Sequence, residues 1–178
     1  VQTCALPISM NNINPLTIRT SLIPFDQISV SHVAPAIDQL LHRATKELED
    51  LKNFSGTRTF ENTMTTLDNL GLDLDFAMGI LSHLESVATT PEWRSAYNSI
   101  LPKVSDFRSR LLLDEGLWRA LKDYAASSEV SSLPAHKSRF LTKTLDTFRR
   151  NGAELPTSQK ELLASIHTEL AQVTNSFS

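Results

Sequence analysis

The sequence is poor in cysteine, glycine and proline and has no long apolar run, as is usual for an ordinary globular chain. Its one cysteine, Cys4, cannot form a disulfide within the chain. The 5 glycines and 8 prolines among 178 residues are too few for long disordered stretches. No apolar run approaches the roughly 20 residues that span a bilayer, and no charged segment leads into an apolar one as in a secretory signal. We therefore expect a cytoplasmic chain of one domain's length, without a membrane partner.

Charge of one sign is not in excess either. Lys and Arg number 17 against 20 Asp and Glu, which gives a net charge of −3 at pH 7. The basic residues are scattered, and the densest pair, Arg149-Arg150, is interpreted as the solvated end of a helix. A nucleic-acid interface needs a basic patch or stripe, so no nucleic-acid partner is expected.

The N-terminal residues fall into two parts. Residues 1–9, VQTCALPIS, differ in character from the sequence that starts at Met10 and resemble a translated cloning adapter. We interpret them as a non-native leader, which removes Cys4 from any function. Residues 10–29 show no sustained period and are predicted to form an extended N-terminal arm. The side chains expected to pin this arm to a core are Ile23, Phe25 and Ile28.

Residues 30–178 are interpreted as an N-terminal helical domain. Apolar residues recur there at steps of three and four, which is the spacing of amphipathic helices. No segment alternates as a strand would. The predicted fold class is therefore all-α, a bundle of about six helices. They span about 31–52, 59–87, 91–111, 114–124, 134–150 and 157–177.

Capping residues, prolines and glycines refine these boundaries. Pro35 is expected in a first turn, and Pro102 is expected to kink the third helix. Gly71 and Gly79 lie inside the second helix, and close helix packing is the expected reason for them. Asn151-Gly152 is typical of a helix end. The expected N-caps are Ser31, Thr59, Thr90 and Asp114.

The last helix keeps its apolar period as far as Phe177, and no Gly or Pro stop follows. We expect the domain to be truncated there. Truncation would leave an apolar face exposed, and such faces usually mark interaction surfaces. The isolated chain is therefore predicted to be marginally stable or to self-associate.

Several short stretches carry a resemblance through their order along the chain. They are NPL at 14–16, PFD-x-I at 24–28, SHVAPAI at 31–37, FENT at 60–63, SHL-x-SV at 82–87, AYN at 96–98, LP at 101–102 and FRR-x-GAELP at 148–156. Together they resemble the N-terminal third of the thimet-oligopeptidase family of zinc metallopeptidases, most closely its bacterial oligopeptidase A branch. The bacterial peptidyl-dipeptidase branch shares the opening features. The resemblance implies a larger, two-lobed helical enzyme whose channel admits short peptides.

The resemblance also implies a zinc ion bound by His-Glu-x-x-His on a later helix. Two histidines four apart share a helix face, and the glutamate activates the zinc-bound water. This sequence has no such motif, so no catalytic, cofactor-binding or metal-binding residue is assigned. Zinc, short peptide substrates and a missing C-terminal catalytic half are expected of the full-length protein, and the fragment alone is expected to be inactive. The five histidines are His32, His42, His83, His136 and His167.

Other chemistry-bearing residues on the second helix have ordinary interpretations. His83 and Glu85 point about 200° apart on a helix, so they cannot easily grip one ion. His83 is expected to be half-buried and hydrogen-bonded. Asp73 and Asp75 are expected to diverge on a solvated face for the same reason. The serines flanking His83 lack a nucleophile elbow and an orienting acid; these are Ser82 and Ser86.

The remaining candidate functional residues are also interpreted as having structural roles. His32 is expected to serve local packing or capping, and His167 at most a minor surface network with Lys160, Glu161 or Glu169. Four aromatic residues could line a peptide channel, but aromatics at helical spacing are more often core. They are Trp93, Tyr97, Phe107 and Trp118.

Two functions therefore stand side by side. The first is the channel-wall portion of a zinc oligopeptidase. The second is a stand-alone helical module that binds a partner helix and has no catalytic activity. The reading frame beyond Ser178 distinguishes them.

Overall fold

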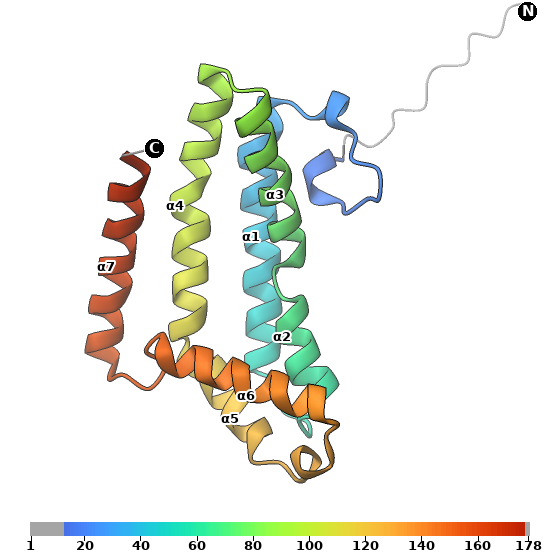
Figure 1. The fold of residues 1–178 in the computed structure, drawn as a ribbon, viewed down its shortest axis with the longest axis vertical. Helices are drawn as coiled ribbons and strands as arrows, with labels where there is room; N and C mark the ends of the chain where they lie inside the picture. Colours follow the sequence, from blue (N-terminus) through green and yellow to red (C-terminus); the bar gives the residue numbers. More distant parts are fainter. Residues whose placement is uncertain (1–12, 177–178) are drawn as a thin grey trace, which may run out of the picture.

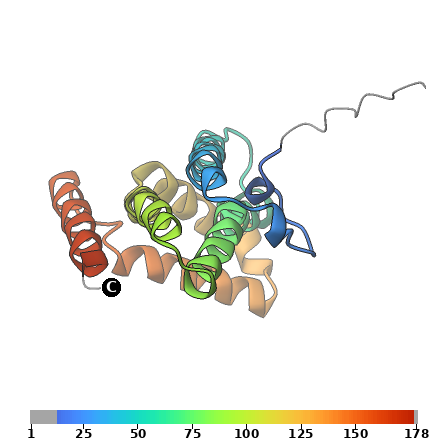
Figure 2. The ribbon, with the colours of Figure 1, turned by 90° about the horizontal axis from the view of Figure 1, so that it is seen from above.

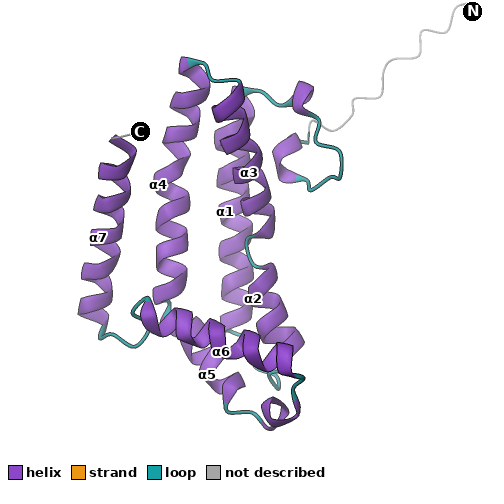
Figure 3. Cartoon of the chain, in the orientation of Figure 1, coloured by secondary structure: helices purple, strands orange, loops and turns teal. Residues whose placement is uncertain are grey.

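The computed structural model describes residues 13–176, and it confirms the all-α class. Among these residues no strand occurs, and helices joined by short loops make up most of the chain (Figure 3). Residues 1–9, with Cys4, and Phe177 lie outside the described residues. The helices are α1 (Val30–Lys52), α2 (Thr66–Asn69), α3 (Leu72–Val87), α4 (Pro91–Leu113), α5 (Glu115–Ala125), α6 (Ala135–Arg150) and α7 (Thr157–Ser176).

The longer helices run side by side along the long axis of the molecule. In Figure 1, α1, α3, α4 and α7 stand upright, and α5 and α6 cross at one end. Figure 2, seen from above, places α7 at one edge of the bundle beside α4. Contacts between α4 and α7 confirm that these two helices pack together.

Three of the four predicted N-caps are confirmed. The Thr59 Oγ1 accepts a hydrogen bond from the Asn62 N–H at 3.2 Å. Thr90 and Asp114 accept from backbone N–H groups three residues later, at 3.3 and 2.8 Å. These side chains satisfy N–H groups that a helix start leaves without a partner.

The fourth predicted cap, Ser31, is wrong. Helix α1 begins at Val30, and Ser29 is its N-cap residue. The Ser29 N–H donates to His32 Nδ1 at 3.2 Å, so the imidazole supports the start and confirms the expected capping role of His32. Pro35 consequently lies inside the helix, beyond the first turn.

The second predicted helix is broken at Gly71. Its first part opens as a π-helical turn over Phe60–Thr65, continues as α2 and stops, and α3 then starts afresh. Gly71 has φ +80°, a left-handed conformation that side chains disfavour. A Cβ atom at Gly71 or Gly79 would meet nothing within 4 Å, so close packing is not the reason for either glycine. The break escaped the sequence analysis because the apolar period continues across it.

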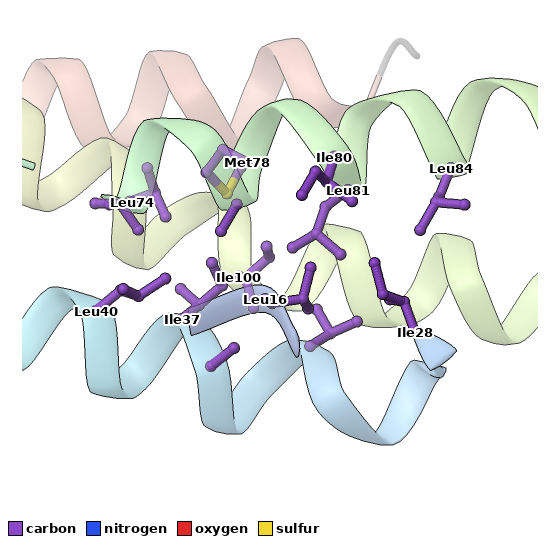
Figure 4. Close-up of a cluster of buried hydrophobic side chains, with 14 residues drawn as sticks. Leu16, Ile28, Ile37, Leu40, Leu74, Met78, Ile80, Leu81, Leu84 and Ile100 are labelled. Carbon is purple, nitrogen blue, oxygen red and sulfur yellow. The ribbon is translucent and has the colours of Figure 1, made fainter. Parts of the chain in front are cut away.

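One hydrophobic cluster joins α1, α3, α4 and the arm (Figure 4). The arm is not extended throughout, because it makes short 3₁₀ turns at Pro15–Thr17 and Phe25–Gln27. Ile28 is buried as predicted, but Phe25 remains 42% exposed. The strongest anchor is Leu16, only 1% exposed, which the sequence analysis did not select.

A second cluster lies at the end where α5 and α6 cross. Trp118 of α5 stacks on Phe148 of α6, with ring centroids 6.1 Å apart and an interplanar angle of 11°. Helix α6 then ends at Arg150, with Asn151 as its C-cap and Gly152 following at φ +95°, which confirms the predicted stop signal. The left-handed φ favours glycine here, and a Cβ on Gly152 would also lie 2.8 Å from a methyl group of Leu155, which would have to shift.

Candidate functional site

The histidine and glutamate of α3 do not converge. His83 is exposed, and its ring lies 5.8 Å from the ring of Phe25 at 51°. Glu85 instead pairs with Arg94 at 3.3 Å, across the turn between α3 and α4. The expectation of a half-buried His83 is therefore wrong, because its partner is the exposed arm rather than the core.

The paired aspartates of α3 diverge, as predicted. Asp73 binds Arg43 of α1 at 2.7 Å and Arg19 of the arm at 2.9 Å. Asp75 binds Arg108 of α4 at 2.5 Å. Each carboxylate thus joins α3 to a neighbouring element, which is more than the purely solvated face that the sequence analysis expected.

The two serines near His83 do not form a nucleophile site. Both Ser82 and Ser86 are exposed, and the Ser86 hydroxyl donates to the Ser82 carbonyl oxygen at 2.9 Å. This is a bond back to the helix's own preceding turn. The side chain of His167 lies outside the described part of the chain.

The four aromatic residues belong to the cores, which confirms the structural interpretation. Trp93 and Tyr97 are partly buried against the α1–α3–α4 cluster, and Phe107 lies against both clusters. Trp118 is 4% exposed. The guanidinium carbon of Arg149 lies over the Trp118 ring, 5.7 Å from its centroid.

The described residues provide no candidate metal centre. No group of three or more His, Cys, Asp or Glu side chains among residues 13–176 is placed so that it could hold an ion. None of the helices in this described range is both long and apolar enough to cross a membrane.

The start of α5 is a junction that fixes both α1 and α7. Lys52, at the end of α1, donates to Asp114 at 2.9 Å and to Glu49 at 2.7 Å. Burial alone would lower the pKa of Lys52, but the hydrogen bonds to Glu49 and Asp114 outweigh it and raise the pKa. The ammonium group therefore stays charged and ties α1 to the α4–α5 turn.

Glu115, the neighbouring acid at this junction, ties α7 to the start of α5. Glu115 accepts from the Thr157 hydroxyl at 3.0 Å and from Lys160 at 3.4 Å. The Thr157 hydrogen bond, followed by the hydrogen bond and charge of Lys160, lowers the pKa of Glu115. Lys160 is only 8% exposed, so one side of α7 is turned firmly inward.

The opposite side of α7 is apolar and faces outward. Its residues are spaced by four, four and three, so they form one line along the helix, here named the outer α7 row. The exposed apolar face that the sequence analysis predicted for the last helix is therefore present. The row consists of Leu162 (61% exposed), Ile166 (48%), Leu170 (59%) and Val173 (47%).

Comparisons with known proteins identify where such a helical unit occurs. Residues 37–160 match the family model described as the N-terminal domain of neurolysin and thimet oligopeptidase. The chain belongs to this family. The match covers most of α1, every helix from α2 to α6 and the first residues of α7.

Curated relatives in the family extend the match towards both ends of the chain. The chain is 28% identical over 165 residues to oligopeptidase A of Escherichia coli K12, covering 93% of this chain and 24% of that protein. It is 30% identical over 165 residues to the organellar oligopeptidase A of Arabidopsis thaliana, covering 93% of this chain and 21% of that protein. The chain thus spans about a quarter of the length of these relatives.

Proposed function

We propose that this chain is the N-terminal helical portion of a longer zinc-dependent oligopeptidase and forms part of the wall of its peptide channel. The observation that carries the proposal is the match of residues 37–160 to the N-terminal domain of the neurolysin and thimet oligopeptidase family. The confirmed all-α fold supports it, since the resemblance implied an almost entirely helical enzyme. The relatives are named oligopeptidases, so short peptides are the proposed substrates.

The residues that the structure describes do not fit a zinc site. The histidines include no pair four apart, and no cluster of metal-ligating side chains occurs among residues 13–176. We therefore place the zinc ion and the catalytic step outside this chain and assign no catalytic residue to it. The chain's own contribution is a rigid wall, whose helices are held by two hydrophobic clusters and by the junction at Asp114 and Glu115.

The proposed compartment is the cytoplasm. One Arabidopsis relative is named a probable cytosolic oligopeptidase A and another an organellar one, so compartment varies among relatives. The relative named a probable cytosolic oligopeptidase A and the scarcity of cysteine, one residue in the chain, support the cytoplasm.

A peptidase assay on the full-length product of the parent gene tests this function. We expect it to cleave short fluorogenic peptides, to leave a folded protein intact, to lose activity with a chelator and to regain it with zinc. The 178-residue chain alone, as the matched control, is expected to be inactive. A full-length protein without peptidase activity would contradict the proposal, and chelator-resistant activity would contradict the zinc.

The competing function is a stand-alone module that binds a partner helix, and the outer α7 row is the observation that favours it. A module would be complete without any peptidase region. Its gene product would bind a separate protein through this row and would lack hydrolytic activity under all conditions of the assay above.

A further inference from the structure

Helix α7 has two faces of opposite character. Its inner face carries Lys160, bound to Glu115, and Leu163, whose methyl group would lie 2.9 Å from a Cβ on Gly152. Its outer face is the outer α7 row, in which each side chain is about half exposed or more. An isolated exposed leucine is ordinary, but a continuous apolar line along one helix is typical of an interaction surface.

The charge beside the row is negative. Glu161 and Glu169 are exposed on α7, and neither pairs with a residue whose side chain is described. The helix's lysine, Lys160, faces inward and does not offset them. A helix that covers the row is therefore matched best by an apolar ridge with cations along its flank, because complementary charges favour one partner and repel others.

We propose that the outer α7 row is the docking face for an amphipathic helix from the remaining part of the full-length protein, with an apolar ridge and a cationic flank. The proposal rests on the function proposed above and deepens it. The chain covers 24% of Escherichia coli oligopeptidase A, so about three quarters of that relative lies outside the match. Anchors spaced by three and four residues are what a helix packed along α7 would engage.

A second copy of the chain fits the row less well. Two α7 helices packed row against row would bring the acidic flanks of Glu161 and Glu169 together from both copies. Like charges placed opposite one another in an interface are unfavourable. Self-association through this row, which the sequence analysis also predicted, is therefore the alternative that the experiment must detect.

Thiol labelling of the full-length protein tests whether the row is covered. We would introduce Leu170→Cys in a Cys4→Ser background and measure maleimide modification of that site by mass spectrometry. Leu22→Cys is the matched control, since Leu22 lies on the arm and is 85% exposed. We expect Cys at 170 to react at least about tenfold more slowly in the full-length monomer than in the 178-residue chain. The control is expected to react equally fast in both.

Two outcomes would overturn the proposal. One is equal reactivity at position 170 in the chain and in the full-length monomer. The other is protection that appears only as protein concentration rises and dimers form, because the occupant would then be a second copy. The peptidase assay is separate: a covered row in an inactive protein would keep this inference and reject the proposed function, and an active protein with an open row would do the reverse.

Charge reversal tests the cationic flank. In the full-length Leu170→Cys protein, Glu161→Lys with Glu169→Lys is expected to speed labelling several-fold by weakening the docked helix. Asp68→Lys on α2 is the control, because Asp68 is also exposed but lies far along the chain from α7. Labelling that the double reversal leaves unchanged would show that the covering helix carries no cations opposite these glutamates.

Discussion

Helices α1 and α7 have the same kind of apolar spacing, but the apolar face of α1 is buried and that of α7 is largely exposed. Helix α1 has 23 residues and α7 has 20, and both carry apolar residues at steps of three and four. The stripe of α1 is almost completely buried, with Ile37 at 0% and Leu40 at 1% exposed, whereas Leu162 and Leu170 on α7 are 61% and 59% exposed. Both helices are nevertheless fixed at one end by neighbouring acids at the start of α5, Asp114 and Glu115.

The apolar period of a helix specifies only part of its environment. The period determines that a helix has an apolar face, but the segments that cover the face come from elsewhere in the chain. Helix α1 receives α3, α4 and the arm as neighbours. Helix α7 receives α4 on one face only, and its other face is directed outward.

The largest expected effect on stability comes from truncating one apolar residue of α1, compared with one of the outer α7 row. Ile37→Ala in α1 is expected to lower the free energy of unfolding by about 3 kcal/mol, since the site is fully buried and leaves a cavity. Leu170→Ala in α7 is expected to change it by less than about 0.5 kcal/mol. Urea unfolding of the 178-residue chain, followed by circular dichroism, measures both. Equal losses would show that α7 is buried as deeply as α1.

The next effect concerns the lysine that anchors α1. Lys52→Ala is expected to cost about 1–2 kcal/mol, because the side chain is 17% exposed and its loss leaves the partly buried Asp114 without its cationic partner. Lys46→Ala is the matched control on the same helix. Its ion pair with Asp50 is 69% and 67% exposed, and solvent screening is expected to leave it with little effect on stability. Similar losses from both variants in chemical unfolding would reject the junction as a specific anchor.

A smaller effect tests the left-handed backbone conformation at Gly71, where α3 begins. Gly71→Ala is expected to destabilise the chain by about 1 kcal/mol, because the residue adopts φ +80° even though space for a Cβ exists. Gly79→Ala, inside α3 with equal space, is expected to stabilise it by about 0.5–1 kcal/mol through helix propensity. Thermal unfolding distinguishes the two, and a shift of the same sign for both would contradict the left-handed break at Gly71.

The smallest effect is a pH dependence confined to the anchored end of α7. The folded pKa of Glu115 lies below its ordinary value of 4.5, so its contribution is present above pH 4.5 and lost as the pH falls through the folded value. Amide exchange in α7, corrected for the intrinsic pH effect, is therefore expected to accelerate modestly relative to α1 on acidification. Glu115→Gln should remove most of this difference, and a variant that retained it in full would count against the Glu115 anchor.

The sequence predicted which segments form helices better than it predicted the residues at which those helices start and end. The caps Thr59, Thr90 and Asp114 could be identified because each pairs a hydroxyl or carboxylate with N–H groups a few residues away. Ser31 was chosen in place of Ser29 because two serines stand near the helix start, and the expected capping role of His32 did not indicate which of them its imidazole would support.

Long-range features were harder to predict for a physical reason. Lys52 and Asp114 are 62 residues apart, and lysines are mostly solvated, so nothing local indicates that they meet. The surroundings of Leu16 and His83 likewise depend on where the arm folds back onto α1 and α3. The outer α7 row was foreseen in part, because its period was visible before its exposure was known.

Sequencing the parent gene beyond codon 178 tests the proposed function most directly. We expect a reading frame that continues for several hundred codons and encodes His-Glu-x-x-His with a further glutamate downstream, supplying the zinc ligands and the polypeptide that covers α7. A stop codon shortly after codon 178 would contradict it. The chain would then be a helical protein without a catalytic half, and the outer α7 row would belong to a separate partner.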